Sequence, residues 1–460
     1  MTAPRRISTA VVSLSKRPAS RRIVVAGALL AAAGSVYIGA VRATTPGAGF
    51  GSGDFQWSPT RLLLHGIDPY AARMAGSEDI ILTQSPNYLH LLYWVLTPFG
   101  ALPFVAALWS WMVLNVLLSV GLGLWYGRMA HLGRAGSLLI TAALLCSTPF
   151  RLGLSNGQHA VVVLACATVA FAAAQRPWAG PVLALALTKY SFAPFGLVLL
   201  VKGRLRALLV AALTLLLAAG GMSLVTGTAL GTVLMEPFRL SRAVVGDGAA
   251  DVMTVLSLTP WFSSTSPALT VIGVLTAAAS TVCLARVLRD GDWVFGLGVA
   301  AMISLVSFKH LTHDFVLLLP VVVLLLRMRG PRAWLGWAAL GYHWLLLGVL
   351  AQFGTAIDTP AVIVVSFFVL VALLVLVAST PTARWAELQR NALPTALPEV
   401  RNEGVAGPDT VAPRRPANLD GAARPAGPQA GLVTGSEEAR ARSRAFTGPT
   451  EEELTPEPSA

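Results

Sequence analysis

Long apolar runs separated by short polar segments repeat along most of the chain. They cover residues 23–41, 101–126, 137–150, 159–174, 206–225, 267–288, 293–308, 313–328, 333–350 and 361–379. Most of these runs approach the roughly 20 residues that a helix needs to cross the hydrocarbon core. Only structures that satisfy their own backbone hydrogen bonds are stable there, so the pattern predicts an all-α, polytopic transmembrane helical bundle with about ten full spans. The composition, 55% hydrophobic and 12% charged, excludes an ordinary soluble domain.

A further apolar segment, residues 178–201, is interrupted near its centre by the sequence TKYS and then by Pro194. The basic residues, which give the chain a net charge of +12, cluster in short loops between apolar runs. This distribution is typical of the positive-inside rule and does not indicate a nucleic-acid site. If the interrupted segment enters the membrane and returns as a short helical hairpin, the basic residues 202–206 fall on the cytoplasmic side with the other basic loops. We therefore expect the hairpin in addition to the full spans, with both termini cytoplasmic.

This topology divides the chain into three regions. Residues 1–22 are predicted to form a basic cytoplasmic arm, and residues 23–379 the transmembrane domain. The large outward loops of that domain cover residues 43–87 and 226–266. Residues 380–460 are rich in Pro, Ala, Gly, Arg and Glu and contain few apolar residues. Such a segment cannot bury enough apolar surface to fold, so we expect a disordered cytoplasmic tail.

The first outward loop contains the best-placed carboxylate, Asp54. It precedes a helix-like stretch that Ser58 and Pro59 would begin and Gly66 would end. Residues 62–64, all leucine, are expected to press this helix onto the membrane surface and leave Asp54 at its mouth. Ionisable residues at a membrane are costly and are therefore functional candidates. An aspartate that merely caps the helix is an equally good interpretation.

Further polar candidates lie in the same loop and along the spans. Asp68 and Tyr70 belong to an Asp-Pro-Tyr sequence that favours a turn, so we rank Asp68 below Asp54. Gln158 and its neighbour His159 begin a span from the outer side, where they could bind sugar hydroxyls or simply be solvated beside a helix cap. Lys189 is far from both ends of its segment and needs water or an anionic partner, and a phosphate suits its compact charge.

The sequence KHLTHD at residues 309–314 is the densest polar cluster outside the tail. His310 and His313 are three residues apart and share a helix face, next to Asp314. A metal site would need a third spaced ligand. We favour a cationic cluster, with Lys309, that binds a phosphate at the outer face, and an ordinary polar cap is the alternative. The chain has no Walker A motif, no dinucleotide-binding glycine motif and no serine nucleophile elbow, which favours a donor presented from the membrane.

The ordered set HGIDPY, SPNY with PFGALP, NGQHAVVVLA, PVLALALTKYSFAPF and SFKHLTHDFVLLLP resembles the family 87 glycosyltransferases. These are polytopic C-type enzymes that use polyprenyl-phosphate-linked sugars, and actinobacterial members are α-mannosyltransferases. The resemblance covers most of residues 23–379 in order and spacing. It implies a helical bundle of the C-type glycosyltransferase kind. The family's G-Q-x-N element ends here in Ala160, so its usual asparagine is missing.

The resemblance also assigns roles to the candidate residues. Asp54 would be the general base that deprotonates the acceptor hydroxyl. Cationic side chains would offset the charge that builds on the departing lipid phosphate. The remaining candidates are polar residues of the shared motifs, expected to bind substrate or the donor phosphate: Lys189, Lys309, His310, His313, Gln158, Tyr70 and Asp68.

The reaction implied is an inverting transfer of a hexose, with mannose the first choice, from a polyprenyl-phosphate-linked donor to a lipid or glycan acceptor. It would occur at the outer face of a bacterial cytoplasmic membrane, among membrane lipids and without a nucleic-acid partner. The first outward loop has no D-x-D sequence, so we expect no metal and no other cofactor. Two other functions fit the same residues: a transferase for a lipid-linked pentose such as arabinofuranose, and a flippase or transporter of a lipid-linked sugar. A non-catalytic homologue is a further alternative, because of Ala160.

Overall fold

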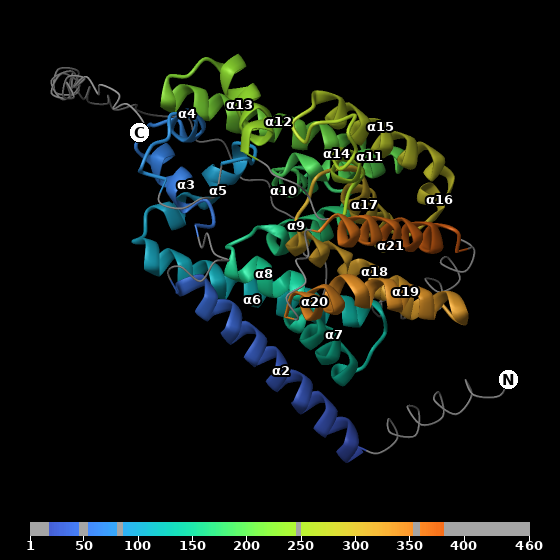
Figure 1. Cartoon of the computed structure of the whole chain (residues 1–460). Helices are drawn as coiled ribbons and strands as arrows, with labels where there is room; N and C mark the ends of the chain where they lie inside the picture. Colours follow the sequence, from blue (N-terminus) through green and yellow to red (C-terminus); the bar gives the residue numbers. More distant parts are fainter. Residues whose placement is uncertain (1–17, 46–53, 81–85, 245–249, 353–358, 381–460) are drawn as a thin grey trace, which may run out of the picture. The chain divides into compact units, whose positions relative to one another are not determined.

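The computed structural model describes residues 18–45, 54–80, 86–244, 250–352 and 359–380, and the regular elements in these ranges are helices (Figure 1). The chain divides into two units, Met1–Ala396 and Leu397–Ala460, and everything described here belongs to the first. Most of the predicted N-terminal arm and nearly all of the predicted tail lie outside the described residues. So do residues 46–53, 81–85 and 245–249 of the two predicted outward loops.

The first half of the described chain contains α2 (Pro18–Thr44), α3 (Trp57–Leu64), α4 (Pro69–Met74), α5 (Leu91–Gly100), α6 (Phe104–Met129), α7 (Arg134–Cys146), α8 (Thr148–Ser155), α9 (Ala160–Ala172), α10 (Ala179–Ala186), η1 (Tyr190–Phe192), α11 (Ala193–Val201) and α12 (Leu205–Thr226). The second half contains α13 (Leu230–Val244), α14 (Val252–Ser257), α15 (Pro267–Cys283), α16 (Ala285–Asp290), α17 (Trp293–Ser307), η2 (Thr312–Leu318), α18 (Leu319–Arg327), α19 (Pro331–Gly341), η3 (Tyr342–Leu346), α20 (Leu347–Gln352) and α21 (Pro360–Ala378).

Helix α17 forms the centre of this bundle. Every residue of α17 after Trp293 is buried, and the helix packs against α9, α11, α15, α18 and α21. A helix that is apolar around its whole circumference is stable only when other helices cover it on all sides, which is the environment that α17 has. Its first turn is fixed by Asp292, whose Oδ1 accepts a hydrogen bond from the Phe295 backbone N–H at 2.6 Å.

Four of the described helices, α2, α6, α12 and α21, are long and apolar enough to cross a membrane. Helices α7 and α8 would add a fifth crossing as one broken span, bent by 55°. The break falls at Ser147, where the backbone is extended and the side-chain oxygen accepts from the Phe150 N–H at 3.3 Å. The other predicted spans are helical but shorter or broken, such as α9 with 13 residues. The predicted all-helical class is therefore confirmed for the described residues, which include four candidate membrane spans, whereas the count of about ten spans is not confirmed.

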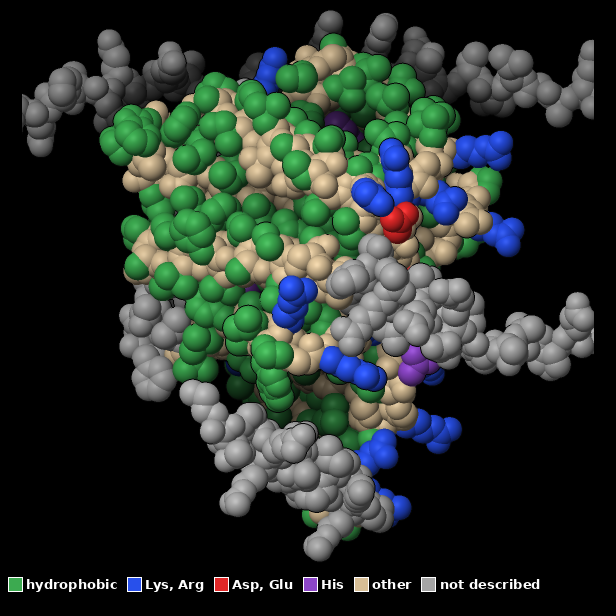
Figure 2. Space-filling model, turned by 90° about the vertical axis from the view of Figure 1, so that its right-hand side faces the viewer, with side chains coloured by type: hydrophobic (Ala, Val, Ile, Leu, Met, Phe, Trp, Pro, Cys, Tyr) green, Lys and Arg blue, Asp and Glu red, His purple; other side chains and the backbone are tan. Residues whose placement is uncertain are grey.

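Exposed apolar side chains support the membrane assignment. Figure 2 shows hydrophobic side chains over a broad area of one face, with Lys and Arg side chains gathered toward one side of it. Large side chains on the candidate spans are open to the surroundings, among them Leu30 at 75% and Leu224 at 87% exposure. Water would disfavour so much exposed apolar surface, whereas lipid tails would not.

The interrupted segment, residues 178–201, breaks at the predicted place. Helix α10 ends at Ala186, and α11 begins at Ala193 after the short helix η1. Both ends of the segment lie at the beginning of α12. Near the first end, a Cβ on Gly180 would be 3.0 Å from the Ala207 carbonyl oxygen. At the second end, Lys202 follows α11, and α12 begins soon afterwards at Leu205. The chain therefore turns back near Lys189, which is the geometry that a hairpin requires.

A cluster of three charged residues marks one end of α17. Lys202 Nζ donates to the carbonyl oxygens of Leu288, at 2.8 Å, and Gly291, at 2.7 Å. Beside it, Arg327 Nη1 contacts Asp292 Oδ2 at 2.7 Å. We call Lys202, Asp292 and Arg327 the Lys202 cluster. The 15 residues of α17 span about 22 Å at the rise of an α-helix, so Lys309 and His310, which follow α17, lie that far from this cluster.

Candidate active site

Asp54 is buried, with an exposed fraction of 0%. Its Oδ1 accepts a hydrogen bond from the backbone N–H of Ser58 at 3.0 Å, in the first turn of α3. Its buried Oδ2 has no hydrogen-bond partner in the described part of the chain. Burial raises the pKa of Asp54 above the usual carboxyl value, and hydrogen bonds from Ser58 and Trp57 oppose this shift. One oxygen therefore anchors the helix, as the capping interpretation requires, and the other is left for a substrate proton.

The helix that follows Asp54 does not lie on the membrane surface in the predicted manner. Leu62 and Leu63 are buried at 4% and 1% exposure, and only Leu64 is exposed, at 46%. Helix α3 packs on α5 and α4, so two of the three leucines fill the protein interior. The prediction for these leucines was wrong because residues 91–100 form a helix that covers this side of α3.

Asp68 and Tyr70 hold the first loop in place. Asp68 Oδ1 caps α4 by accepting from the Tyr70 N–H at 2.9 Å, and its Oδ2 accepts from the Thr228 hydroxyl at 2.9 Å. Tyr70 is fully buried, and its hydroxyl donates to the Tyr88 carbonyl oxygen at 2.6 Å. Glu236 of α13 also belongs to this group, because burial and the charge of Asp68 raise the pKa of Glu236 to about 7. The predicted turn chemistry of Asp68 thus describes its contacts better than substrate binding does.

The turn that contains Gln158 lies directly against the residue after Asp54. Gly157 has a φ of +62°, and a Cβ there would be 3.0 Å from the Phe55 nitrogen, so only glycine fits without strain. The Tyr88 hydroxyl donates to Gln158 Oε1 at 3.2 Å. The buried ring of His159 packs 4.9 Å from the Tyr88 ring, between centroids. These contacts bring residues 54–55, 88 and 157–159 into one group.

Lys189 has an anionic partner within the protein. Its Nζ contacts Asp314 Oδ2 at 2.5 Å, with side-chain exposures of 17% for Lys189 and 1% for Asp314. Asp314 Oδ2 also accepts from the Leu311 backbone N–H at 3.2 Å, and Asp314 Oδ1 lies 3.7 Å from His313 Nε2. The two sequence candidates, Lys189 and the histidine turn, therefore meet through a carboxylate between them.

Electrostatic interactions connect this ion pair with the first group. Burial and the charge of Asp314 raise the pKa of the Tyr88 hydroxyl. Burial and the charge of Lys189 lower the pKa of His159. The Cβ of His313 also lies 3.6 Å from the position that a Cβ on Gly153 of α8 would occupy, four residues before the Gly157 turn. Asp54, Gln158, Lys189 and His313 thus belong to one polar region at the end of α17 that is remote from the Lys202 cluster.

His310 faces a second carboxylate, Asp251, which the sequence analysis missed. His310 Nδ1 lies 3.9 Å from Asp251 Oδ2 and 3.2 Å from the Phe308 carbonyl oxygen, while its Nε2 has no hydrogen-bond partner within the described ranges. Asp251 is itself fully buried and caps α14 through the Thr254 N–H, at 2.8 Å. Burial lowers the pKa of His310, and the charge of Asp251 opposes that shift.

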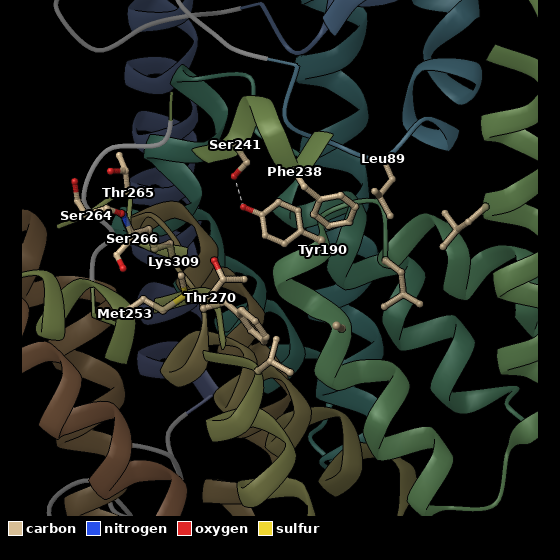
Figure 3. Close-up of a pocket in the computed structure, with 15 residues that line it drawn as sticks. Leu89, Tyr190, Phe238, Ser241, Met253, Ser264, Thr265, Ser266, Thr270 and Lys309 are labelled. Carbon is tan, nitrogen blue, oxygen red and sulfur yellow. Dashed lines mark hydrogen bonds between the residues drawn. The ribbon is translucent and has the colours of Figure 1, made fainter. Parts of the chain in front are cut away.

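A largely apolar cavity of about 440 Å³ adjoins this polar region (Figure 3). Tyr190, next to Lys189, hydrogen-bonds to Ser241 across one side of the cavity and packs against Phe238 at 5.6 Å between ring centroids. Lys309 lines another side, and its Nζ donates to the Ser264 carbonyl oxygen at 2.9 Å. A predominantly apolar cavity with a lysine at its wall suits a ligand with a hydrocarbon part and an anionic part.

Residues 91–308 match the model of glycosyltransferase family 87. Family 87 is a glycosyltransferase family, so the match supports a transferase activity for this chain. No curated protein and no solved structure matched the chain.

The family 87 match runs from the beginning of α5 to the residue after α17. It contains Gln158, Lys189 and Asp251, and it excludes Asp54 and residues 309–314. The match is shorter than the resemblance over residues 23–379 that the motifs indicate. The contacts described above nevertheless place Asp54 and Asp314 beside residues of the matched region.

Proposed function

We propose that this chain transfers a hexose, with mannose the first choice, from a polyprenyl-phosphate-linked donor to a lipid or glycan acceptor. The observation that carries this proposal is Asp54, a buried carboxylate next to the polar region around Lys189, with one oxygen that has no partner among the described residues. The family 87 match supports glycosyl transfer. The apolar cavity beside Lys309 supports a donor whose leaving group is a lipid.

In the proposed reaction, Asp54 takes the proton of the acceptor hydroxyl, and the acceptor oxygen bonds to the anomeric carbon. The bond from that carbon to the phosphate oxygen breaks, and polyprenyl phosphate leaves with the electron pair. Attack from the face opposite the leaving group inverts the anomeric centre, so a β-linked donor gives an α-glycoside. Lys189, Lys309 and His310 stabilise the charge that develops on the departing phosphate.

The arrangement of charge along α17 supports a site on the outer side of the membrane. The Lys202 cluster lies at one end of this helix and His310 follows the other end. Basic loops remain on the cytoplasmic side in most membrane proteins, so we assign the Lys202 cluster to the cytoplasm and the candidate site to the outer face. A cysteine introduced at Asp79, in the exposed segment after α4, should react with an impermeant maleimide in intact cells.

The activity is tested by transfer of radiolabelled mannose from polyprenyl-phosphate-mannose to membrane lipids. The native chain should transfer label, Asp54→Asn should lose at least about a hundredfold in rate, as for a lost general base, and Asp79→Asn should match the native chain as a control carboxylate in the same loop. Equal transfer by native chain and Asp54→Asn would keep the enzyme class and remove Asp54 as the base. No transfer by any of the three would direct the test to a lipid-linked arabinofuranose and then to transport of a lipid-linked sugar.

Independence from metal is part of the same proposal. Cationic side chains can stabilise a departing lipid phosphate without an ion. Transfer should therefore persist in a chelator, and a loss that Mg²⁺ or Mn²⁺ restored would contradict this part of the proposal.

A further inference from the structure

His343 is a buried histidine that the proposed reaction does not use. Its exposed fraction is 0%, and neither of its ring nitrogens has a hydrogen-bond partner among the described residues. It belongs to η3, a five-residue π-helix between α19 and α20. Single π-helical turns are rare and frequently lie at functional sites, and buried polar groups without a partner are costly. Both observations indicate that this side chain has a role beyond packing.

The residues on both sides of His343 fix η3 in place. Trp344 Nε1 donates to the Phe315 carbonyl oxygen at 2.9 Å, which joins η3 to η2. The hydroxyls of Tyr342 and Ser366 are hydrogen-bonded at 3.0 Å, which joins η3 to α21. The backbone of His343 is therefore held on two sides, and its ring lies inside the bundle.

The ring of His343 lies near His310. Both imidazoles pack against the Phe315 ring, His343 at 4.2 Å and His310 at 5.1 Å between ring centroids. The two imidazole centroids are therefore at most about 9 Å apart, which is the sum of these distances. An electrostatic interaction connects the two rings. His310 Nε2 also has no hydrogen-bond partner in the described ranges, so three such nitrogens gather around one phenylalanine ring.

The contacts of His310 determine where a further proton would bind. Its Nδ1 lies 3.2 Å from the Phe308 carbonyl oxygen, which can only accept, so Nδ1 carries the hydrogen of the neutral ring. A further proton therefore binds at Nε2, and the new N–H group then needs an acceptor. A neutral imidazole always has one nitrogen that is free to accept, and His343 can supply it.

We propose that His310 and His343 form a coupled pair that holds one proton. His310 carries the proton on Nε2, and the bare nitrogen of neutral His343 accepts its hydrogen bond through one bridging water. Such a water suits two buried polar groups that have no other partners. His343 acts through His310 and is therefore a positioning residue. Its effect on transfer rests on the proposed function, in which His310 stabilises the departing phosphate, whereas the coupling of the two rings does not.

The other charged groups around the pair stay the same when only His343 is changed. His310 faces Asp251 of α14, Asp314 and His313 of η2, Lys189 before η1 and its own neighbour Lys309. His343 contacts Tyr342, and the helices that pack on η3 carry Arg151 in α8 and Arg332 in α19. A change in the titration of His310 can therefore be assigned to the ring of His343.

The test follows the imidazole signals of the full chain in micelles by NMR, with isotope-labelled histidine, during a pH titration. His343→Phe keeps a ring without a nitrogen, so the titration midpoint of His310 should fall by about one pH unit, as for a lost hydrogen bond to a charged group. His343→Gln keeps an acceptor and should retain most of the native midpoint. His65→Gln changes an exposed histidine after α3 and is the matched control. No shift in His343→Phe, or an equal shift in His343→Gln or His65→Gln, would overturn the proposal.

The native chain alone provides a second test if a variant fails to fold. The accepting nitrogen of His343 should change its chemical shift at the same midpoint as His310, while the ring of His343 stays neutral. Separate midpoints, or a cationic His343, would contradict the pair. In the mannose transfer assay above the His310 midpoint, His343→Phe should raise the donor KM about tenfold, the equivalent of one pH unit, and change kcat less. Coupled midpoints without any transfer would support the pair and refute the proposed function.

Discussion

The ion pair between Lys189 and Asp314 allows the sharpest test of the candidate site. Lys189 directly precedes η1 and Asp314 lies in η2, and both short helices interrupt the α-helical backbone. The two residues are 125 positions apart in the sequence. Three variants separate the contributions: Lys189→Met, Asp314→Asn, and the double variant Lys189→Met/Asp314→Leu. Methionine and leucine fill comparable volume without charge.

The expected magnitudes follow from the burial of each partner. Removing one member of a buried pair costs about 3–5 kcal/mol, because the remaining charge is uncompensated. Lys189→Met leaves the Asp314 carboxylate at 1% exposure, so its cost should fall in the upper part of that range. Asp314→Asn leaves Lys189 at 17% exposure, where water can reach the ammonium group, and should cost about 3 kcal/mol or less. The double variant removes both charges, and its cost should be smaller than the sum of the single losses by about 1–3 kcal/mol.

Stability can be measured as the denaturation midpoint in mixed micelles, and transfer of labelled mannose in the same preparations. All three variants should lose transfer, whereas the double variant should recover much of the stability. Single losses that simply add in the double variant would show that the pair has no energetic coupling. A larger loss for Asp314→Asn than for Lys189→Met would refute the reasoning from burial.

Three further predictions concern separate features. Burial raises the pKa of Asp54, and the proposed base acts in its ionised form. The kcat/KM for transfer should therefore rise with pH, with a midpoint above the pKa of an exposed aspartate. A midpoint at the usual carboxyl pKa would contradict this. Gly157→Ala should destabilise the chain by about 1–3 kcal/mol, through backbone strain and the close approach of the new Cβ to Phe55. Gly76→Ala, also at positive φ but with open space around it, should cost less. Equal shifts in Tm for the two variants would show that the close approach to Phe55 contributes nothing. Leu187→Trp, which narrows the apolar cavity, should raise the KM for a long-chain polyprenyl donor more than for a short-chain one, and equal effects on both donors would place the lipid elsewhere.

The partner of Lys189 could have been found in the sequence. The position of Lys189 predicts an anionic partner, and Asp314 is the one acidic residue between Trp293 and Gln352. A phosphate and an internal carboxylate satisfy the same electrostatic requirement, and the sequence pattern alone does not distinguish them. The proximity of Asp251 to His310 had no comparable signal, because it depends on how α14 packs against α15, α17 and α21.

The apolar pattern predicts helices well and spans less well. The run at residues 293–308 has the composition of a short span, yet α17 is covered by protein on all sides. Helices inside a bundle and helices against lipid are apolar for the same physical reason, so a window of 13–17 residues cannot distinguish them. The four helices long enough to cross a membrane come from longer runs. The run at residues 267–288 is also longer than this window but forms only the 17 residues of α15, so the length of a run does not decide either.

The balance of charge in the candidate site constrains how a donor could bind. The site contains two lysines, Lys189 and Lys309, and three carboxylates. These are Asp54, Asp251 and Asp314. Burial lowers the pKa of His310 and favours its neutral form. An incoming phosphate would therefore meet no net positive charge unless a proton accompanied it. The phosphate itself would raise the pKa of His310 through its negative charge, so donor binding should take up a proton there. The KM for the donor should then increase as the pH rises in the native chain and depend less on pH in His310→Gln. A pH dependence identical in both would show that the lysines bind the phosphate without help from this histidine.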